Sequence, residues 1–312
     1  MRTPANTPQG GGAVRYLKVA LRVLVTGGAA AALYHFAEFG VVWELLTSAN
    51  IALMSAALLV MLAIVPASAL RVQALLGPDR HKMTHAALTA DYFEGTFFNM
   101  LLPTGVGGDL IRALRIGSRE VEGKRAFALV VAERVMGFAT MGVLAAIGAP
   151  FIEVPTPLRL MAYAMAVGAI VGSIVLFSGT GIEWLRDRLP GGWAQGILDY
   201  AGEFGEMRRE GTLPRAFGIT LVLHVTLVTS IWLAGLAIGC ELQLLVCMVL
   251  VPMVIVASLA PSLGGLGVRE GAFVVLFTQA GLTQEQALSL GVAYLAMALC
   301  QAIVGGVVYL LR

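Results

Sequence analysis

The sequence predicts an all-α, polytopic integral membrane protein with about six spanning helices and two re-entrant hairpins in an inverted-topology repeat. Its composition is 58% hydrophobic and 13% charged, whereas soluble domains are about 25% charged. Apolar segments of about 20 residues, the length that spans a bilayer, recur along the chain. Two proline–glycine breaks, at 103–109 and 261–270, interrupt apolar segments at matching places in the two halves.

Six segments are apolar and long enough to span. They are 17–37, 50–70, 126–149, 158–178, 216–238 and 286–311. The first follows basic residues as a signal peptide would, but its apolar stretch exceeds the usual 7–15 residues, so we expect it to be retained. Residues 1–14 are rich in Pro, Gly and polar side chains and are expected to be disordered. Residues 15–312 then form a single transmembrane domain.

The distribution of charge sets the orientation, because Lys and Arg concentrate on the cytoplasmic side. The basic residues fall in alternate connections and at both ends of the chain: Arg2, Arg15, Lys18, Arg71, Arg80, Lys82, Arg115, Arg119, Lys124, Arg125, Arg186, Arg188, Arg208, Arg209, Arg215 and Arg312. The opposite segments (38–49, 150–157, 239–243 and 280–285) carry Glu but no Lys or Arg. We expect a bacterial-type inner (plasma) membrane protein with both termini cytoplasmic.

This orientation forces segments 86–114 and 244–280 to enter and leave on one face each. Two crossings need about 40 residues, and the first segment has 29. We expect it to be a re-entrant hairpin from the cytoplasmic face. The second, with 37 residues, is expected to enter from the other face, although two short crossings are also open. The halves, about 15–150 and 158–312, then have opposite orientation, and the hairpin tips should meet and line a cavity.

The cytoplasmic loop 180–215 contains an amphipathic helix. Its apolar residues recur at helical spacing: Trp193, Ile197, Tyr200, Phe204 and Met207. Such a helix either lies on the membrane interface or packs against the protein's own loops, and both alternatives are open.

The first hairpin carries ionisable residues where the membrane makes charge costly, which favours a functional role. Asp91 and Glu94 share a helix face, and Asp109 is expected to cap a helix over 110–116 that carries Arg112. An open Gly–Gly backbone at a helix start beside an arginine favours an anion site. The alternative is local charge pairing at the interface. The remaining candidates of this segment are Asn99, Pro103, Thr104, Gly107 and Gly108.

The second hairpin repeats the pattern, with Val268 expected to start a helix. Arg269 lies in the first turn, where the helix dipole disfavours a cation, so it needs an anionic partner, either Glu270 or a ligand phosphate. Its other candidates are Pro261, Ser262, Gly264, Gly265 and Gly267. Glu133 and Arg134 are adjacent on 126–149 and should each pair with a different hairpin residue.

Other motifs are lacking. No G-x-G-x-x-G follows a strand, there is no G-x-x-x-x-G-K-[ST], and no His-Glu-x-x-His occurs. We therefore expect no cofactor, no metal and no nucleic acid. His224, in 216–238, is expected to be a hydrogen-bonded buried side chain. Gly168, Gly172, Gly305 and Gly306 are expected to allow close helix packing.

Three signatures resemble those of the flippase-like family, also called the lysylphosphatidylglycerol synthase transmembrane family. They are Phe97-Phe98-Asn99 with 102–109 and Arg112, then Glu133-Arg134, then 261–271. The resemblance covers roughly 15–311. It implies a membrane protein that moves lipids between leaflets, in pathways of aminoacylated phosphatidylglycerol, polyprenyl-phosphate sugars or hopanoids. Family members with aminoacyl-transferase activity carry a large C-terminal domain; this chain ends at Arg312, so we expect no synthase activity.

The expected function is a lipid flippase or transporter for a phosphate-bearing lipid, not an enzyme. Arg112, Arg134 and Arg269 are expected to hold the phosphate. Asp91, Glu94, Asp109, Glu133 and Glu270 are expected to orient these arginines, bind a cationic headgroup or take up protons. One alternative is a membrane-embedded lipid-modifying transferase that uses Asp91 and Glu94; another is a non-catalytic partner of lipid-biosynthesis enzymes, acting through 180–215.

Overall fold

The computed structural model describes residues 39–101, 107–119, 121–178, 200, 202–260 and 266–312. The regular structure of this part is helical. Its elements are α2 (Phe39–Thr47), α3 (Ile51–Leu76), η1 (Gly77–Lys82), α4 (His85–Leu101), α5 (Gly107–Gly117), α6 (Gly123–Gly148), η2 (Ala149–Phe151), α7 (Thr156–Ser178), α10 (Thr212–Ala237), α11 (Leu244–Ala257), α12 (Val268–Thr278) and α13 (Gln284–Leu311).

Five described helices are long and apolar enough to cross a membrane: α3 with η1, α6, α7, α10 and α13. They confirm five of the six predicted spans; the sixth, 17–37, lies outside the described residues, as does the segment 1–14. The all-α, polytopic fold class is therefore confirmed. Three boundaries differ. The helix expected over 50–70 extends to Leu76. The helix expected from 216 begins at Thr212, and the expected connection 38–49 contains α2. The mean hydropathy of Thr212–Arg215 is too low for these residues to be counted in an apolar segment, although they form the first turn of the helix.

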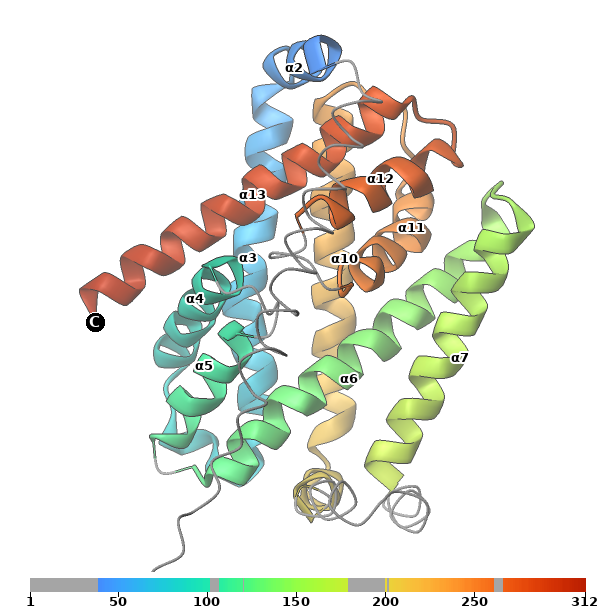
Figure 1. Cartoon of the computed structure of the whole chain (residues 1–312). Helices are drawn as coiled ribbons and strands as arrows, with labels where there is room; N and C mark the ends of the chain where they lie inside the picture. Colours follow the sequence, from blue (N-terminus) through green and yellow to red (C-terminus); the bar gives the residue numbers. More distant parts are fainter. Residues whose placement is uncertain (1–38, 102–106, 120, 179–199, 201, 261–265) are drawn as a thin grey trace, which may run out of the picture.

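The long helices α3 and α10 lie side by side and form the centre of the molecule (Figure 1). The hairpin α4–α5 lies in the lower half of the view, where α3 ends and α6 begins, and α11–α12 lies in the upper half. The hairpin helices have 17, 11, 14 and 11 residues, fewer than the ~20 of a spanning helix. The helix expected over 110–116 starts earlier, at Gly107, so Asp109 lies in its first turn and does not cap it.

The helix contacts of one half recur in the other. In the first half α3 packs on α4, α4 on α5 and α5 on α6; in the second α10 packs on α11, α11 on α12 and α12 on α13. Between the halves, α4 packs against α13, and α11 packs against α6. Exchanging the two halves thus maps these contacts onto themselves.

Glycines permit the closest of these approaches. A Cβ at Gly108 of α5 would overlap the carbonyl of Gly95 in α4, and one at Gly305 of α13 would overlap the carbonyl of Phe93. The packing role expected of Gly305 is thus confirmed. The same expectation for Gly168 and Gly172 is wrong, because a Cβ there meets no atom within 4 Å. Both lie on the exposed face of α7.

The segment 180–215 packs against the protein over its described part. Residues 202–209 are helical, and Phe204 and Met207 are buried in a hydrophobic cluster with α3, α4 and α6. Arg125 of α6 lies 2.7 Å from Glu210 and 3.6 Å from Glu203, which fixes this helix. Burial raises the pKa of the Glu203 carboxyl, and the positive charge of Arg125 partly offsets this rise. Of the two alternatives for this loop, packing against the protein itself is the one that residues 202–209 show.

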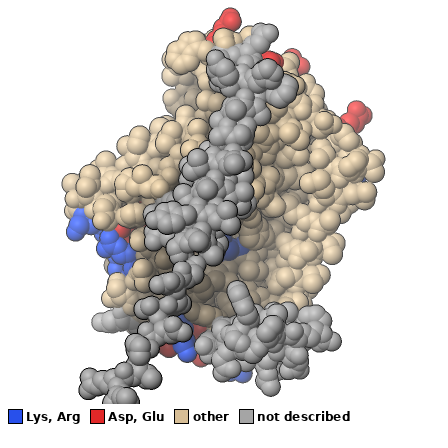
Figure 2. Space-filling view, in the orientation of Figure 1, with Lys and Arg blue, Asp and Glu red and all other residues tan. Residues whose placement is uncertain are grey.

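Charge separates between the ends of the molecule. In Figure 2 acidic side chains gather at the top of the view, at the α2 end, whereas basic side chains gather at the lower left and the bottom. The residues between these ends are mostly uncharged, as expected for a protein surrounded by lipid.

Candidate functional site

A polar cavity of about 250 Å³ lies between the first hairpin and the central helices. It is lined by residues of α3, α4, α5, α6, α10 and α11: Arg71, Tyr92, Thr96, Asn99, Asp109, Arg112, Glu133, Arg134, Gly137, Phe138, Met141, His224, Ile255 and Leu259. Glu133 lies ten residues after the start of α6, or about 15 Å along its axis. Gly123–Phe151 is long and apolar enough to cross a membrane, so Glu133 lies near the middle of a candidate span.

Glu133 is the centre of the charge network in this cavity. The residue is 3% exposed, and its carboxylate accepts hydrogen bonds from Arg71 Nε at 2.9 Å and Arg112 Nη2 at 2.6 Å. The Tyr92 hydroxyl donates a further hydrogen bond to the same carboxylate. The Arg112 guanidinium also lies 4.0 Å above the Tyr92 ring. Three helices are thereby joined to α6 through one carboxylate.

The start of α5 is fixed by a second set of contacts. Arg134 Nε donates to Asp109 Oδ2 at 2.7 Å, and Arg112 lies 3.5 Å from the same carboxylate. The Gly108 amide donates to Asn99 Oδ1 at 2.8 Å. Glu133 and Arg134 thus pair with Arg112 and Asp109, two different residues of the first hairpin, as predicted.

The lining carries three arginines, Arg71, Arg112 and Arg134, against two carboxylates, Asp109 and Glu133, an excess of one positive charge. Arg112 is 7% exposed, and its Nε has no hydrogen-bond partner. The Arg134 side chain is 45% exposed. An unfilled donor and an accessible guanidinium in a low-dielectric cavity favour an anion, and arginine suits phosphate or carboxylate.

Asp91 and Glu94 do not line this cavity. They are 1% and 0% exposed, and they face a separate group of arginines. Asp91 accepts from Arg119 at 2.6 and 2.9 Å and from Arg312 at 2.9 Å. Glu94 pairs with Arg312 at 3.0 Å and Arg115 at 2.8 Å. The expected single chamber is therefore divided, because Asp91 and Glu94 occupy a different face of α4 from Tyr92.

Arg269 and Glu270 form a third group, which is also outside the described lining of the cavity. Arg269 donates to Glu270 Oε1 at 2.9 and 3.1 Å, and Glu270 Oε2 accepts from the Gly267 amide at 2.6 Å. The Arg269 guanidinium lies 4.8 Å from the Tyr294 ring of α13. Glu270, one of the two anionic partners expected for Arg269, is in contact with it. α12 starts at Val268, as predicted.

The remaining candidate residues lie at the starts of α5 and α12 or outside the described residues. Gly107 and Gly108 are buried at the start of α5, and Gly267 precedes α12 with φ 77°. Pro103, Thr104, Pro261, Ser262, Gly264 and Gly265 lie outside the described residues.

Sequence reasoning missed Arg71 and Tyr92 as cavity residues. The sequence places Arg71 in a basic cytoplasmic connection, but it lies within α3, which extends to Leu76. The signal for Tyr92 was its helical spacing from Thr96 and Asn99, which places the three on one face of α4. His224 is hydrogen bonded as expected, since its Nδ1 lies 2.6 Å from Thr140 Oγ1, yet it also lines the cavity.

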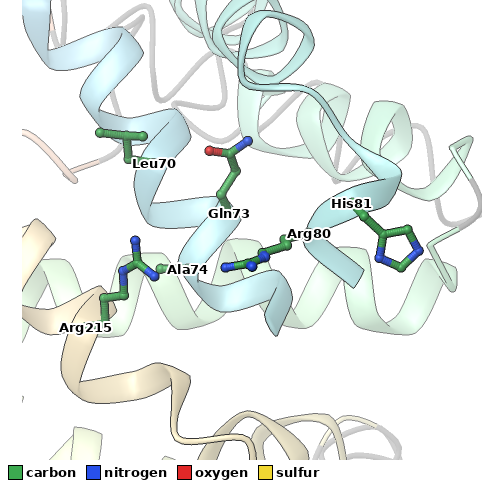
Figure 3. Close-up of a pocket in the computed structure, with 6 residues that line it drawn as sticks. All are labelled: Leu70, Gln73, Ala74, Arg80, His81 and Arg215. Carbon is green, nitrogen blue, oxygen red and sulfur yellow. The ribbon is translucent and has the colours of Figure 1, made fainter. Parts of the chain in front are cut away.

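A second pocket lies at the basic end of the molecule. It has a volume of about 310 Å³ and is lined by Leu70, Gln73, Ala74, Arg80, His81 and Arg215. Figure 3 shows Arg80 extending towards Arg215, with His81 pointing away from both. Both arginines are exposed, as suits residues at a membrane surface.

The comparison with protein families decides the classification. The family model described as "Lysylphosphatidylglycerol synthase TM region" matches residues 19–305. The chain belongs to this family. The Glu133–Arg112 and Arg134–Asp109 ion pairs, with the neutral Gly108–Asn99 hydrogen bond beside them, thus lie within the region that this family model matches. A search of curated proteins gave no match.

Proposed function

We propose that this member of the family is a flippase or transporter that moves a phosphate-bearing lipid between membrane leaflets. The observation that carries the proposal is the cavity at membrane depth with three arginines and two carboxylates. An ionisable side chain inside a membrane carries a large desolvation cost, so its presence there usually indicates a functional role. An arginine N–H without a hydrogen-bond partner suits a headgroup phosphate. A phospholipid, a polyprenyl phosphate or a hopanoid-pathway lipid has this chemistry.

The proposed topology supports this function. We infer that α4–α5 and α11–α12 are re-entrant hairpins from opposite faces of a bacterial inner membrane, in halves related by an inverted repeat, with both termini cytoplasmic. The short hairpin helices and the exchange symmetry of the contacts support it. Single cysteines at Lys82 and Arg119 should react with an impermeant maleimide from the cytoplasmic side, and one at Glu285 from the other side. Labelling of positions 82 and 119 from different sides would refute the topology.

The function is tested by reconstituting the protein in vesicles with fluorescent phosphatidylglycerol and measuring quenching of the outer leaflet by dithionite. Arg134→Ala should slow the protein-dependent exchange, since it removes the accessible cation of the cavity. Arg134→Lys should retain part of the rate, because lysine keeps the charge but not the bidentate geometry. Arg209→Ala is the matched control, because Arg209 is an exposed arginine of helix 202–209 outside the cavity. Equal rates for Arg134→Ala and Arg209→Ala would refute the proposed site.

We also propose that the chain transports lipid without modifying it. Asp91 and Glu94, the residues of the transferase alternative, are both engaged by arginines, which makes them poor metal ligands or bases. Incubation of the purified protein with lipid donors and acceptors, followed by lipid mass spectrometry, tests this. A new lipid product that chelator abolishes would establish the transferase. The lipid that copurifies with the protein would identify the transported species.

A further inference from the structure

A cationic cleft lies at the basic end of the molecule, between the end of α3 and the start of α10. The pocket of about 310 Å³ described above adjoins another of about 360 Å³, both within the ~300–1,000 Å³ of ligand sites. The two pockets share Gln73, Ala74, Arg80 and Arg215, so they are neighbouring parts of one cleft. None of these four is among the described residues that line the polar cavity, so the cleft is a separate site.

The two arginines of the cleft lack an anionic partner. In Figure 3 the guanidinium groups of Arg80 and Arg215 both point towards Ala74 of α3. Neither arginine forms an ion pair with a carboxylate of the described residues.

The carboxylates nearest to these arginines in the sequence are engaged by other cations. Asp79 lies 2.9 Å from Lys82, and Glu210, which lines the second pocket, lies 2.7 Å from Arg125. Two guanidinium groups that face one cleft repel each other, and a bound anion would convert this repulsion into two attractions. Arginine suits phosphate because its planar group donates two parallel hydrogen bonds.

The surroundings of the cleft favour a lipid as the source of the phosphate. The cleft lies where one candidate span, Ile51–Lys82, ends and another, Thr212–Ala237, begins. Leu70, which lines the first pocket, is 49% exposed. The exposed residues Leu59 and Ala63 precede it on the same face of α3 at helical spacing. A phosphate between the arginines would therefore have apolar surface beside it on the side of the membrane interior.

We propose that this cleft binds the phosphodiester of an anionic phospholipid, with the glycerol backbone at Leu70 and the acyl chains in the bilayer along α3. Basic residues at a membrane surface attract anionic lipids, and a zwitterionic headgroup should bind less well because its ammonium group is repelled by the arginines. The lipid in this cleft is a bound partner of the protein and not the transported molecule, so the inference does not depend on the proposed function.

Photolabelling of the full-length protein in neutral detergent micelles tests the site, with phosphatidylglycerol that carries a diazirine in its headgroup. Mass spectrometry of peptides should find label on the segment 70–83. The double variant Arg80→Gln, Arg215→Gln should lower this labelling about tenfold for each arginine lost, because each removes a charged hydrogen bond to the phosphate. Arg80→Lys with Arg215→Lys should retain part of it, since lysine keeps the charge.

The matched control is the double variant Lys124→Gln, Arg209→Gln. It removes the same charge from two exposed basic residues outside both pockets, and it should leave the labelling of segment 70–83 unchanged. Equal losses in the two Gln double variants would overturn the inference, because the effect would then be one of net charge. Melting temperatures equal to wild type establish that the variants are folded.

Competition in the wild-type protein identifies the source of the phosphate and decides the matter if a variant does not fold. Unlabelled phosphatidylglycerol should displace the label. Phosphatidylcholine and water-soluble glycerol 1-phosphate, at the same concentration, should not. Displacement by phosphatidylcholine as effective as that by phosphatidylglycerol would refute the selectivity for an anionic lipid. Equally effective displacement by glycerol 1-phosphate would reveal a site for soluble phosphate esters and overturn the lipid assignment.

The cleft and the polar cavity are tested independently. Arg134→Ala should leave the labelling of segment 70–83 unchanged, because Arg134 lines the polar cavity. Labelling of the cleft without protein-dependent lipid exchange would keep this site and remove the proposed flippase. Exchange without labelling of the cleft would remove this site and keep the flippase.

Discussion

The Glu133 carboxylate provides the sharpest test of the cavity. Glu133→Ala removes the acceptor shared by Arg71, Arg112 and Tyr92, and it leaves two guanidinium groups at membrane depth without their main partner. Removal of one partner from a buried ion pair costs about 3–5 kcal/mol, because the remaining charge is uncompensated. Asp109 still lies 3.5 Å from Arg112, so the loss should fall near the lower end of this range.

The control is Glu206→Ala. Glu206 also pairs with an arginine, Arg125, but at 3.6 Å and with a side chain that is 62% exposed. Exposed pairs contribute about 0–1 kcal/mol. Titration with sodium dodecyl sulfate in mixed micelles, followed by tryptophan fluorescence, measures the free energy of unfolding for both variants.

A double-mutant cycle attributes the loss to the network. Arg71→Ala with Glu133→Ala should be less destabilising than the two single losses added together, with a coupling of about 0.5–3 kcal/mol. A loss for Glu133→Ala no greater than that for Glu206→Ala, or strict additivity in the cycle, would refute the role of Glu133 as the centre of the network.

Three further predictions concern other parts of the chain. Gly108→Ala should destabilise the protein by more than 1 kcal/mol, roughly the cost of overpacking, because its Cβ would overlap the α4 backbone. Gly172→Ala should be neutral or stabilising by up to about 1 kcal/mol, because its Cβ meets no atom and alanine is the better helix former; melting temperatures compare the two. Tyr294→Leu should lose about 1–2 kcal/mol through the contact with Arg269, and Tyr294→Phe should retain most of it, as SDS titration would show. Burial raises the pKa of the Cys240 thiol to about 11 from an ordinary 9.0. Alkylation of Cys240 at pH 8 should therefore be about 100-fold slower than that of a free thiol, and it should accelerate as the pH rises towards 11. An ordinary alkylation rate in the folded protein would contradict the burial of this thiol.

The spanning helices were predictable because lipid imposes a simple rule on sequence. A helix in hydrocarbon must be apolar for about 20 residues, and α6, α7 and α13 begin and end within three residues of the predicted bounds. Proline was a weaker guide to helix ends, because Pro66 and Pro252 lie inside α3 and α11. The sequence offered Glu270 as one of two anionic partners for Arg269, and the two side chains are in contact.

The composition of the cavity was decided by the tertiary structure. Arg71 lies 62 residues from Glu133 in the sequence, and their pairing depends on how α3 packs against α6, which no local pattern encodes. The same holds for Asp91 and Glu94, whose partners include Arg312, 221 residues from Asp91. The sequence alone determined that charge would be buried in this membrane protein, because the residue types and spans are local. The packing of the helices decided which charges face one another, because electrostatic energy depends on distance in space.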